Sequence, residues 1–255
     1  MGEQMNKSLA YIFDVDGTLT PSRTLMDPEF SKFFYEFSTN NNVYIVTGSD
    51  KYKTVEQLGE VNYSMAKKAY QCSGNDVYEG DKSIYSNDWK ISEEVRTFLE
   101  EMLDESDFKK RIGKHIDERI GLCNFSVLGR GTESAKEDRE QYDKDRLEYQ
   151  EFDKKTNERD YICRKFNRRF EYKGIVSQVA GSTGIDIMQV GADKGQIIKD
   201  FDDMNIYFFG DMMQPGGNDE PLKNAIIKRN NSNDKCYQVN GWEQTFSLLK
   251  AMNDS

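Results

Sequence analysis

Long apolar runs, clustered cysteines and an excess of basic charge are all missing from this 255-residue sequence. No stretch of about 18 apolar residues occurs, so no transmembrane helix is expected. The polar segment 1–10 lacks the apolar stretch of a signal peptide, which favours a cytoplasmic location. The cysteines form no CxxC metal pattern and are expected to stay reduced in that compartment; they are Cys72, Cys123, Cys163 and Cys236.

The net charge of -10 makes the chain as a whole a poor partner for nucleic acid or an anionic membrane. A small phosphorylated molecule could still bind wherever basic residues converge locally. The mean hydropathy of -0.82 is polar for a globular protein. Aromatic residues make up 12% of the chain, however, so material for a core is present and disorder is not expected.

Both ends of the sequence alternate between short apolar runs and helical patterns. The apolar runs are typical of buried parallel strands and occupy 9–13, 43–46, 206–209 and 236–239. Helical patterns begin near Asp27-Pro28, at 51–58, near Glu220 and at 241–252. This alternation predicts an α/β fold with a Rossmann-like, doubly wound parallel sheet.

The middle of the chain has a different, α+β character. A hairpin is expected around Gly80-Asp81, a helix over 91–103 and two antiparallel strands within 116–128. The densely charged stretch 133–169 is expected to be helical, and strands are expected at 175–179 and 185–188. The sequence therefore predicts a core domain of residues 1–82 and 190–255, with an inserted α+β cap domain of residues 83–189.

Two carboxylates directly follow the first apolar run, in Asp14-Val-Asp-Gly-Thr18. The carboxyl ends of parallel strands face the ligand crevice, and side chains two residues apart in an extended chain point the same way. Gly17 permits the sharp exit that the chain then needs. The pattern suits a nucleophilic carboxylate at Asp14 and a proton-transferring one at Asp16. The alternative is an ordinary solvated turn after a strand.

The motif resembles the first signature of the haloacid-dehalogenase superfamily, and the other signatures follow in order. Thr47 and Ser49 both suit the hydroxyl after the second strand, and Lys194 suits the basic residue after the cap. Asp211 suits the late acidic group, with Asn218 and Asp219 close behind it. The resemblance implies a fold with an inserted cap and phosphoryl transfer through an aspartyl phosphate.

The chemistry explains why these residue types are needed. Asp14 is an anion and cannot approach a phosphate dianion without nearby cations. One Mg²⁺ could take hard oxygen ligands from Asp14, the backbone carbonyl of Asp16 and Asp211, with Asn218 and Asp219 as further candidates. Lys194 would add positive charge beside the phosphate, and Thr47 or Ser49 would donate to a phosphate oxygen.

Further segments resemble the eukaryotic-type phosphomannomutases, which interconvert mannose 6-phosphate and mannose 1-phosphate. These segments are 13–20 with Arg23, 48–50 with 55–59, and 208–211 with 215–219. The resemblance implies that a hexose 1,6-bisphosphate primes the enzyme, that the substrate is a small hexose phosphate and that two chains can pair through their caps. It also makes Arg23 a candidate substrate residue.

The resemblance extends to the arginines that hold phosphate in the cap. Arg119 and Arg130 lie 11 residues apart, as in that family, and Arg146 opens a family-like run. Arginine clusters bind phosphate through bidentate hydrogen bonds. Asp186 precedes Lys194 at the family's distance, whereas Gly184 stands where the family has a serine, for which Thr183 could substitute.

Three functions are consistent with these residues. The first is a mutase, in which Asp16 deprotonates a sugar hydroxyl that attacks phospho-Asp14. The second is a sugar-phosphate phosphatase of the same fold, in which water attacks instead. The third is a non-catalytic sugar-phosphate-binding protein, which the presence of Asp14, Asp16, Lys194 and Asp211 disfavours. The arginine spacing favours the mutase.

Overall fold

A computed structural model describes residues 8–131 and 138–253 of the chain. By their contacts the residues form two compact units. The core unit comprises Met1–Asn87, Gly191–Pro215 and Asp219–Ser255, and the inserted unit comprises Asp88–Val190 with Gly216–Asn218. The domain boundaries expected from the sequence, 82/83 and 189/190, stay a prediction, and each unit is described by itself.

A seven-stranded sheet forms the centre of the core unit, in the order β11-β10-β1-β2-β3-β4-β5. The five strands from β11 to β3 are parallel, and β4 and β5 join as an antiparallel hairpin at one edge. Their bounds are β1 (Ser8–Phe13), β2 (Asn42–Val46), β3 (Lys68–Gln71), β4 (Asp76–Glu79), β5 (Lys82–Ser86), β10 (Met204–Gly210) and β11 (Lys235–Gln238).

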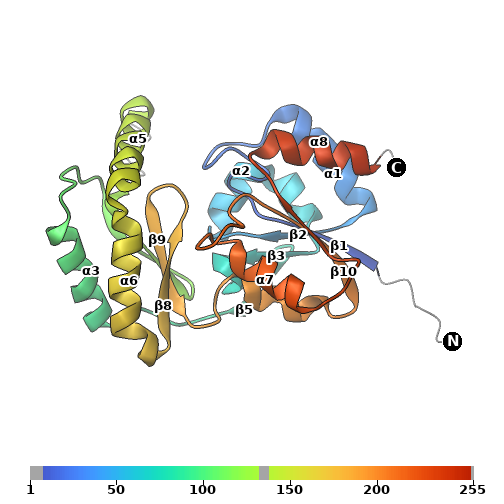
Figure 1. Ribbon diagram of the computed structural model, residues 1–255. Coiled ribbons are helices and arrows are strands. Elements are labelled where there is room, and N and C mark those ends of the chain that lie inside the picture. Colours follow the sequence, from blue (N-terminus) through green and yellow to red (C-terminus); the bar gives the residue numbers. More distant parts are fainter. Residues whose placement is uncertain (1–7, 132–137, 254–255) are drawn as a thin grey trace. The chain divides into compact units, whose positions relative to one another are not determined.

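Helices cover both faces of this sheet (Figure 1). Successive side chains of a strand point to opposite faces. Accordingly Tyr11 and Phe13 of β1 pack with one hydrophobic cluster, and Ala10 and Ile12 pack with another. The first cluster includes side chains of α1 (Pro28–Asn40), α2 (Lys51–Met65) and α8 (Trp242–Asn253). The second includes side chains of the 3₁₀ helix η3 (Lys194–Phe201) and of α7 (Glu220–Lys228).

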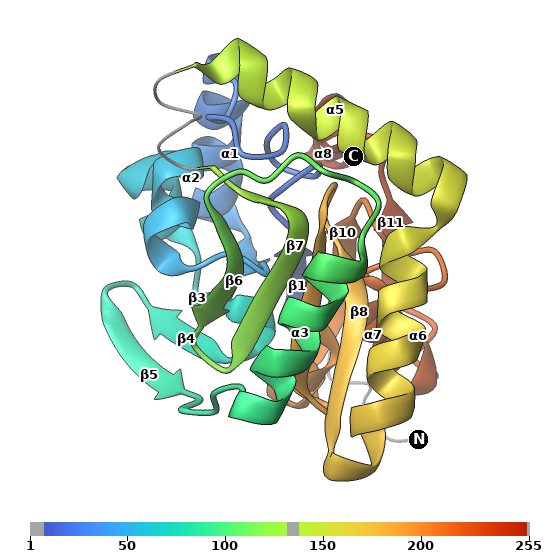
Figure 2. The same ribbon diagram turned by 90° about the vertical axis from the view of Figure 1, so that its left-hand side faces the viewer.

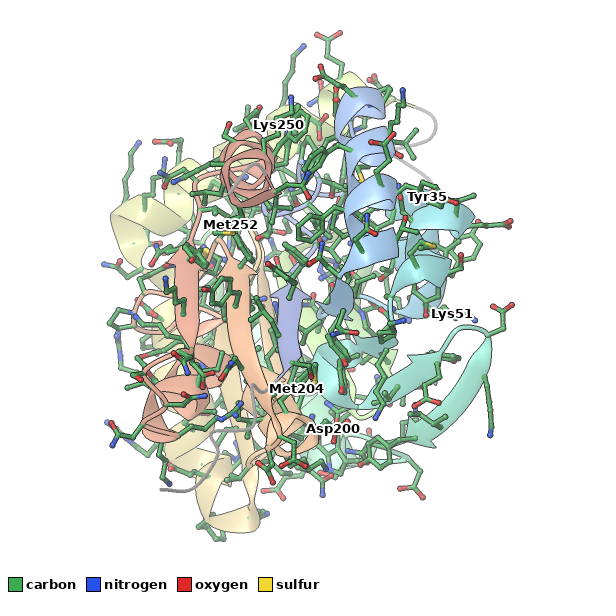
Figure 3. All side chains as sticks on the ribbon, turned by 90° about the vertical axis from the view of Figure 1, so that its right-hand side faces the viewer. Tyr35, Lys51, Asp200, Met204, Lys250 and Met252 are labelled. Carbon is green, nitrogen blue, oxygen red and sulfur yellow. The ribbon has the colours of Figure 1, made fainter. Side chains whose placement is uncertain are left out.

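Local signals set the helix positions in the core unit. The Asp27 carboxylate accepts hydrogen bonds from the backbone of Glu29 and Phe30, and Pro28 takes the first turn of α1, as the sequence predicts. On the side of the core unit seen in Figure 3, the Asp200 carboxylate at the end of η3 accepts from the Tyr70 hydroxyl at 2.8 Å. The Asp27 cap thus fixes where α1 begins, and the Asp200–Tyr70 bond ties the end of η3 to β3.

The inserted unit is a four-stranded antiparallel sheet with helices on one face (Figure 2). The strand order is β6-β7-β9-β8, with bounds β6 (Lys114–Arg119), β7 (Leu122–Arg130), β8 (Ile175–Ala180) and β9 (Gly184–Gln189). The helices are α3 (Glu93–Glu105), α5 (Arg139–Thr156), α6 (Glu158–Phe170) and the short η2 (Glu171–Lys173). Side chains of α3, α5 and α6 pack with Cys123, Phe125 and Ile187 of the sheet in one apolar core.

Some elements differ from the sequence expectations. The helix expected over 51–58 continues to Met65, past Gly59 with its positive φ of 77°. The stretch expected to be helical over 133–169 forms two helices that meet at Asn157, whose φ is 53°, and residues 132–137 lie outside the described residues. Neither β3 nor the 3₁₀ turn η1 (Cys72–Gly74) was expected. In the two described ranges, every helix is too short or too polar to cross a membrane.

Candidate active site

Three loops of the core unit start at the carboxyl ends of neighbouring parallel strands. Asp14 directly follows β1, Thr47 directly follows β2, and Asp211 directly follows β10. The sheet pairing extends one residue into two of these loops, because Asp14 N–H donates to Phe209 O at 2.9 Å and Thr47 N–H donates to Tyr70 O at 2.9 Å. The parallel strands thus place Asp14, Thr47 and Asp211, which the sequence predicts as site residues, at the carboxyl-terminal edge of the sheet.

Lys194 joins two of the acidic residues. Its Nζ lies 2.6 Å from Asp14 Oδ1 and 2.7 Å from Asp219 Oδ1, and its side chain is fully buried. Burial alone would lower the pKa of Lys194, but the charges of Asp14 and Asp219 outweigh it and raise the pKa. The lysine therefore stays charged at neutral pH. Removing one partner of such a buried pair is strongly destabilising, at about 3–5 kcal/mol.

Asp14, Asp211 and Asp219 each offer a carboxylate oxygen, and these three atoms lie within 4.8 Å of one another. Burial, together with the charge of Asp219, raises the pKa of Asp211 to about 7. Burial also raises the pKa of Asp14. The Lys194 charge acts against this rise, and the charges of Asp219 and Asp211 increase it. Three crowded carboxylates exceed the single charge of the lysine, so the donor set fits a hard divalent cation.

The three carboxylates are not equally available to a cation. Asp219 accepts from Lys194 with Oδ1 and from the backbone N–H of Met212 with Oδ2, at 3.0 Å. Asn218, the residue before it, has a buried side-chain oxygen with no hydrogen-bond partner among the described residues. By its contacts Asn218 groups with the inserted unit, whereas Asp211 and Asp219 belong to the core unit.

The Asp211 side chain lies against Gly17, at the position that a side chain of residue 17 would occupy. Its φ is +83°, and an ideal Cβ at this position would lie 2.3 Å from Asp211 Oδ2. A larger residue would meet both backbone strain and a direct clash. The glycine therefore lets the loop after β1 and the loop after β10 come close together.

Asp16 lies in a different electrostatic environment from Asp14. Its Oδ1 accepts from the backbone N–H of Arg23 at 2.6 Å and from Gln57 Nε2 at 3.0 Å, and its Oδ2 lies 3.5 Å from Lys53 Nζ. Burial acts to raise the pKa of Asp16, but the Lys53 charge and these hydrogen bonds outweigh it and lower the pKa to about 2. Asp16 is therefore an anion at neutral pH, which is the form that a general base requires.

The backbone of Arg23 shapes this environment. Its φ of 59° is unusual for a residue other than glycine, and it aims the N–H at Asp16. Arg23 contacts the site through this backbone N–H, and its side-chain charge also helps to lower the pKa of Asp16. The role of the Arg23 side chain as a substrate ligand stays a prediction.

The loop after β2 presents Thr47 and Ser49. Both side chains are buried, and Thr47 Oγ1 accepts from the Ser49 N–H at 3.1 Å. Ser49 Oγ accepts from Lys53 Nζ at 3.1 Å. Cys72 and Ser73, both with positive φ, donate their backbone N–H groups to Ser49 O and Thr47 O. A left-handed turn after β3 therefore holds this loop in place.

The arginines of the inserted unit lie close to acidic and amide side chains. Asp117 Oδ2 lies 3.0 Å from Arg119 Nη2 and 3.8 Å from Arg130 Nε. Arg130 Nε also donates to Asn124 Oδ1 at 2.8 Å, and Asn124 Nδ2 donates to Asp186 Oδ1 at 2.6 Å. Asp117 and Asn124 thus link Arg119, Arg130 and Asp186 into one network.

The remaining candidate substrate residues of the inserted unit are Arg146, Thr183 and Gly184. Arg146 on α5 donates to the Ser182 hydroxyl at 2.7 Å and lies 3.5 Å from Asp143. Thr183 is buried, and its backbone carbonyl accepts from Ser126. Gly184 lies beside Asn124, because an ideal Cβ there would be 2.7 Å from Asn124 Nδ2.

Comparison with known proteins connects this architecture with a family. The family model described as eukaryotic phosphomannomutase matches residues 30–252. The chain belongs to the eukaryotic phosphomannomutase family. It is 30% identical to phosphomannomutase 1 of Mus musculus over 229 residues, which are 86% of this chain and 84% of that protein.

Solved structures agree on the fold of this phosphomannomutase-family chain. The C-terminal domain of C. albicans trehalose-6-phosphate phosphatase has a TM-score of 0.66 at 11% identity, covering 97% of this chain and 93% of that one. A haloacid dehalogenase-like hydrolase from Bacteroides thetaiotaomicron has a TM-score of 0.58 at 13% identity, covering 96% and 100%. The α/β fold and the family resemblance predicted from the sequence are confirmed.

Several residues at these sites were not predicted for this member of the phosphomannomutase family. Ser49, Lys53 and Gln57 are four residues apart, so a helix that starts beside Ser49 presents all three on one side. That spacing could have indicated Lys53 and Gln57. Asp117 and Asn124 carry no comparable signal, because their role depends on strand register.

Proposed function

We propose that this protein is a phosphomannomutase that interconverts mannose 6-phosphate and mannose 1-phosphate through phospho-Asp14. The observation that carries the proposal is the buried contact of Lys194 with both Asp14 and Asp219. It leaves Asp14 Oδ2 as the nucleophilic oxygen and offsets the repulsion between this carboxylate and a phosphate. Family membership supports the choice of reaction.

In the proposed first step, a hydroxyl of the sugar phosphate attacks the phosphorus of phospho-Asp14. Its proton passes to Asp16, whose lowered pKa keeps it ionised. The bond between phosphorus and the Asp14 oxygen breaks, which leaves a carboxylate and a hexose 1,6-bisphosphate. In the second step the other phosphoryl group is transferred to Asp14, and Asp16 returns the proton to the departing sugar oxygen. The reaction therefore balances without a further reactant.

Mg²⁺ is the proposed metal cofactor, held by Asp14, the Asp16 backbone carbonyl and Asp211, with Asn218 as a further candidate. It would neutralise charge on the phosphoryl oxygens when bound. Asp219 is better suited to positioning Lys194, because both of its oxygens already accept hydrogen bonds. Thr47, Ser49 and Lys194 would stabilise the transferred group, as electrostatic groups do in phosphoryl transfer.

The inserted unit is proposed to bind the remainder of the substrate. Arg119, Arg130 and Arg146 would hold the second phosphate, and Asp186 with the 183–184 turn would contact the sugar. A hexose 1,6-bisphosphate as activator, a homodimer through the inserted unit and a cytoplasmic location are further proposals inherited from the family.

The proposal is tested by incubating the protein with mannose 1-phosphate, Mg²⁺ and a trace of glucose 1,6-bisphosphate. Formation of hexose 6-phosphate supports the mutase. Release of inorganic phosphate alone would instead identify a phosphatase, and neither product over a panel of sugar phosphates would favour a binding protein. Asp14→Asn should abolish both turnover and the phosphoenzyme, and retained activity would rule out Asp14 as the nucleophile.

A further inference from the structure

A row of polar side chains crosses the sheet of the inserted unit. Asp117 on β6 lies opposite Asn124 on β7, and Asn124 lies opposite Asp186 on β9. Directly opposed residues present their side chains on the same face of a sheet. The neighbours of Asn124 along the strand, Cys123 and Phe125, belong to the apolar core on the other face. The row therefore lies on the face that the helices of this unit leave uncovered.

Asn124 uses both ends of its carboxamide within this row. Its Nδ2 donates to Asp186 Oδ1 at 2.6 Å, and its Oδ1 accepts from Arg130 Nε at 2.8 Å. The side chain is 2% exposed, so these bonds are shielded from water. A neutral amide is the group that can donate to an anion and accept from a cation at the same time. Asn124 thus connects two charged residues of opposite sign.

We propose that Asn124 is a positioning residue of the substrate site, which fixes Arg130 and Asp186 relative to each other before the sugar phosphate binds. The inference rests on the proposed function, because it takes these two residues as ligands of phosphate and sugar. A bond at Nε sets the plane of a guanidinium, and that plane decides whether bidentate contact with a phosphate is possible. Holding the side chain in advance removes part of the entropy cost of binding.

The surroundings of Asn124 explain why other residue types would not serve. An aspartate would place a second carboxylate at 2.6 Å from Asp186, where like charges repel. A leucine would leave both Arg130 and Asp186 without their amide partner. Gly184 also contributes, because a Cβ there would lie 2.7 Å from Asn124 Nδ2. The absence of a side chain at Gly184 therefore leaves the space that the Asn124 carboxamide occupies.

The test compares Asn124→Ala and Asn124→Asp with a matched control, Asn167→Ala. Asn167 on α6 also uses both ends of its carboxamide inside the inserted unit, but its partners are the backbone and the hydroxyl of Ser177, not charged side chains. In the Mg²⁺-containing assay, both Asn124 variants should raise KM for mannose 1-phosphate by about 10- to 100-fold. The value of kcat should change much less, because the chemistry at Asp14 is untouched. Asn167→Ala should leave KM near that of the wild type.

Two further measurements distinguish a loss of stability from a loss of substrate binding. They are the thermal unfolding of each variant and its calorimetric titration with mannose 1-phosphate. Asn124 variants and Asn167→Ala should show similar falls in Tm, whereas only the Asn124 variants should bind the sugar phosphate more weakly. Unchanged affinity in Asn124→Ala, or an equal loss in Asn167→Ala, would overturn the positioning role while leaving the mutase proposal intact. A wild-type protein that neither turns over nor binds mannose 1-phosphate would overturn the proposed function itself, and the inference with it.

Discussion

Asp219 accepts a hydrogen bond from Lys194 at 2.7 Å, and neither side chain is exposed to solvent. The other oxygen of Asp219 accepts from the Met212 backbone N–H, so both oxygens face donors. Since Lys194 also contacts Asp14, Asp219 determines where the lysine lies relative to the proposed nucleophile. This makes the role of Asp219 separable from that of a metal ligand.

Asp219→Asn should therefore impair both stability and turnover. An asparagine has one oxygen, so its NH₂ group must face either Lys194 or the Met212 N–H, both of which are donors. We expect the free energy of unfolding to fall by about 3–5 kcal/mol and kcat to fall sharply. Urea unfolding and steady-state kinetics check this. Asp203→Asn, at an exposed position of the same unit, should change neither quantity, and wild-type-like kinetics in Asp219→Asn would contradict the role.

Asp211→Asn should stabilise the metal-free protein at pH 8 while removing its response to Mg²⁺. The pKa of Asp211 is raised to about 7 from 3.8, so the folded state holds this proton more tightly than the unfolded state does. The protonated Asp211 side chain therefore contributes to the free energy of unfolding at low pH, and this contribution is lost as pH rises through about 7. Replacing the carboxylate removes that loss and also removes a ligand.

Thermal unfolding with and without MgCl₂ at pH 5.5 and pH 8 measures this effect. The wild-type Tm should rise with Mg²⁺, and more so at pH 8, because protons compete with the metal for the same oxygens. A Mg²⁺ response that survives in Asp211→Asn would place the metal elsewhere.

Several residues of the candidate site could be predicted because each follows an apolar strand. Asp14, Asp16, Thr47 and Asp211 belong to this class, and a strand end is a local signal. Lys194 was suggested by family resemblance alone, since it meets Asp14 across 180 positions of sequence. No local pattern encodes such a contact.

Residues whose role depends on strand register or on backbone conformation were missed. Asn124 looks like one more polar position in an alternating strand until β9 brings Asp186 beside it. The left-handed turn at Cys72–Gly74 was missed because two of its three residues are not glycine, although all three have positive φ. Tertiary hydrogen bonds to Thr47 and Ser49 outweigh the local preference there.

Gly17→Ala should disrupt the metal site more than it destabilises the fold. Its φ of +83° imposes a strain of about 1–2 kcal/mol on any side chain, and the new Cβ would lie 2.3 Å from Asp211 Oδ2. Gly59→Ala is the matched control, because its φ is +77° and nothing lies within 4 Å of the added atom. Gly59→Ala should lower Tm through backbone strain alone, and Gly17→Ala should lower it somewhat further through the clash. Gly17→Ala alone should need more Mg²⁺ for half-maximal activity. Equal Mg²⁺ requirements would show that the loop moves aside without affecting Asp211.

Asp117 should stabilise the inserted unit fully above its unfolded pKa of 3.8, and progressively less as the pH falls toward its depressed folded pKa. Burial acts to raise its pKa, but Arg119 and Arg130 outweigh burial and lower the pKa beneath the ordinary 3.8. A carboxyl with a depressed pKa contributes stability above its unfolded pKa, and that stability is lost as pH falls through the folded value. We expect Asp117→Asn to cost about 2 kcal/mol at pH 6.5, the order of a hydrogen bond to a charged group, and the gap to the wild type to narrow at pH 3. Urea midpoints at the two pH values measure the gap, with the exposed Asp107→Asn as control. A gap that stays constant or widens at pH 3 would mean that Asp117 acts through packing, because only a charge interaction is removed by protonating the carboxylate.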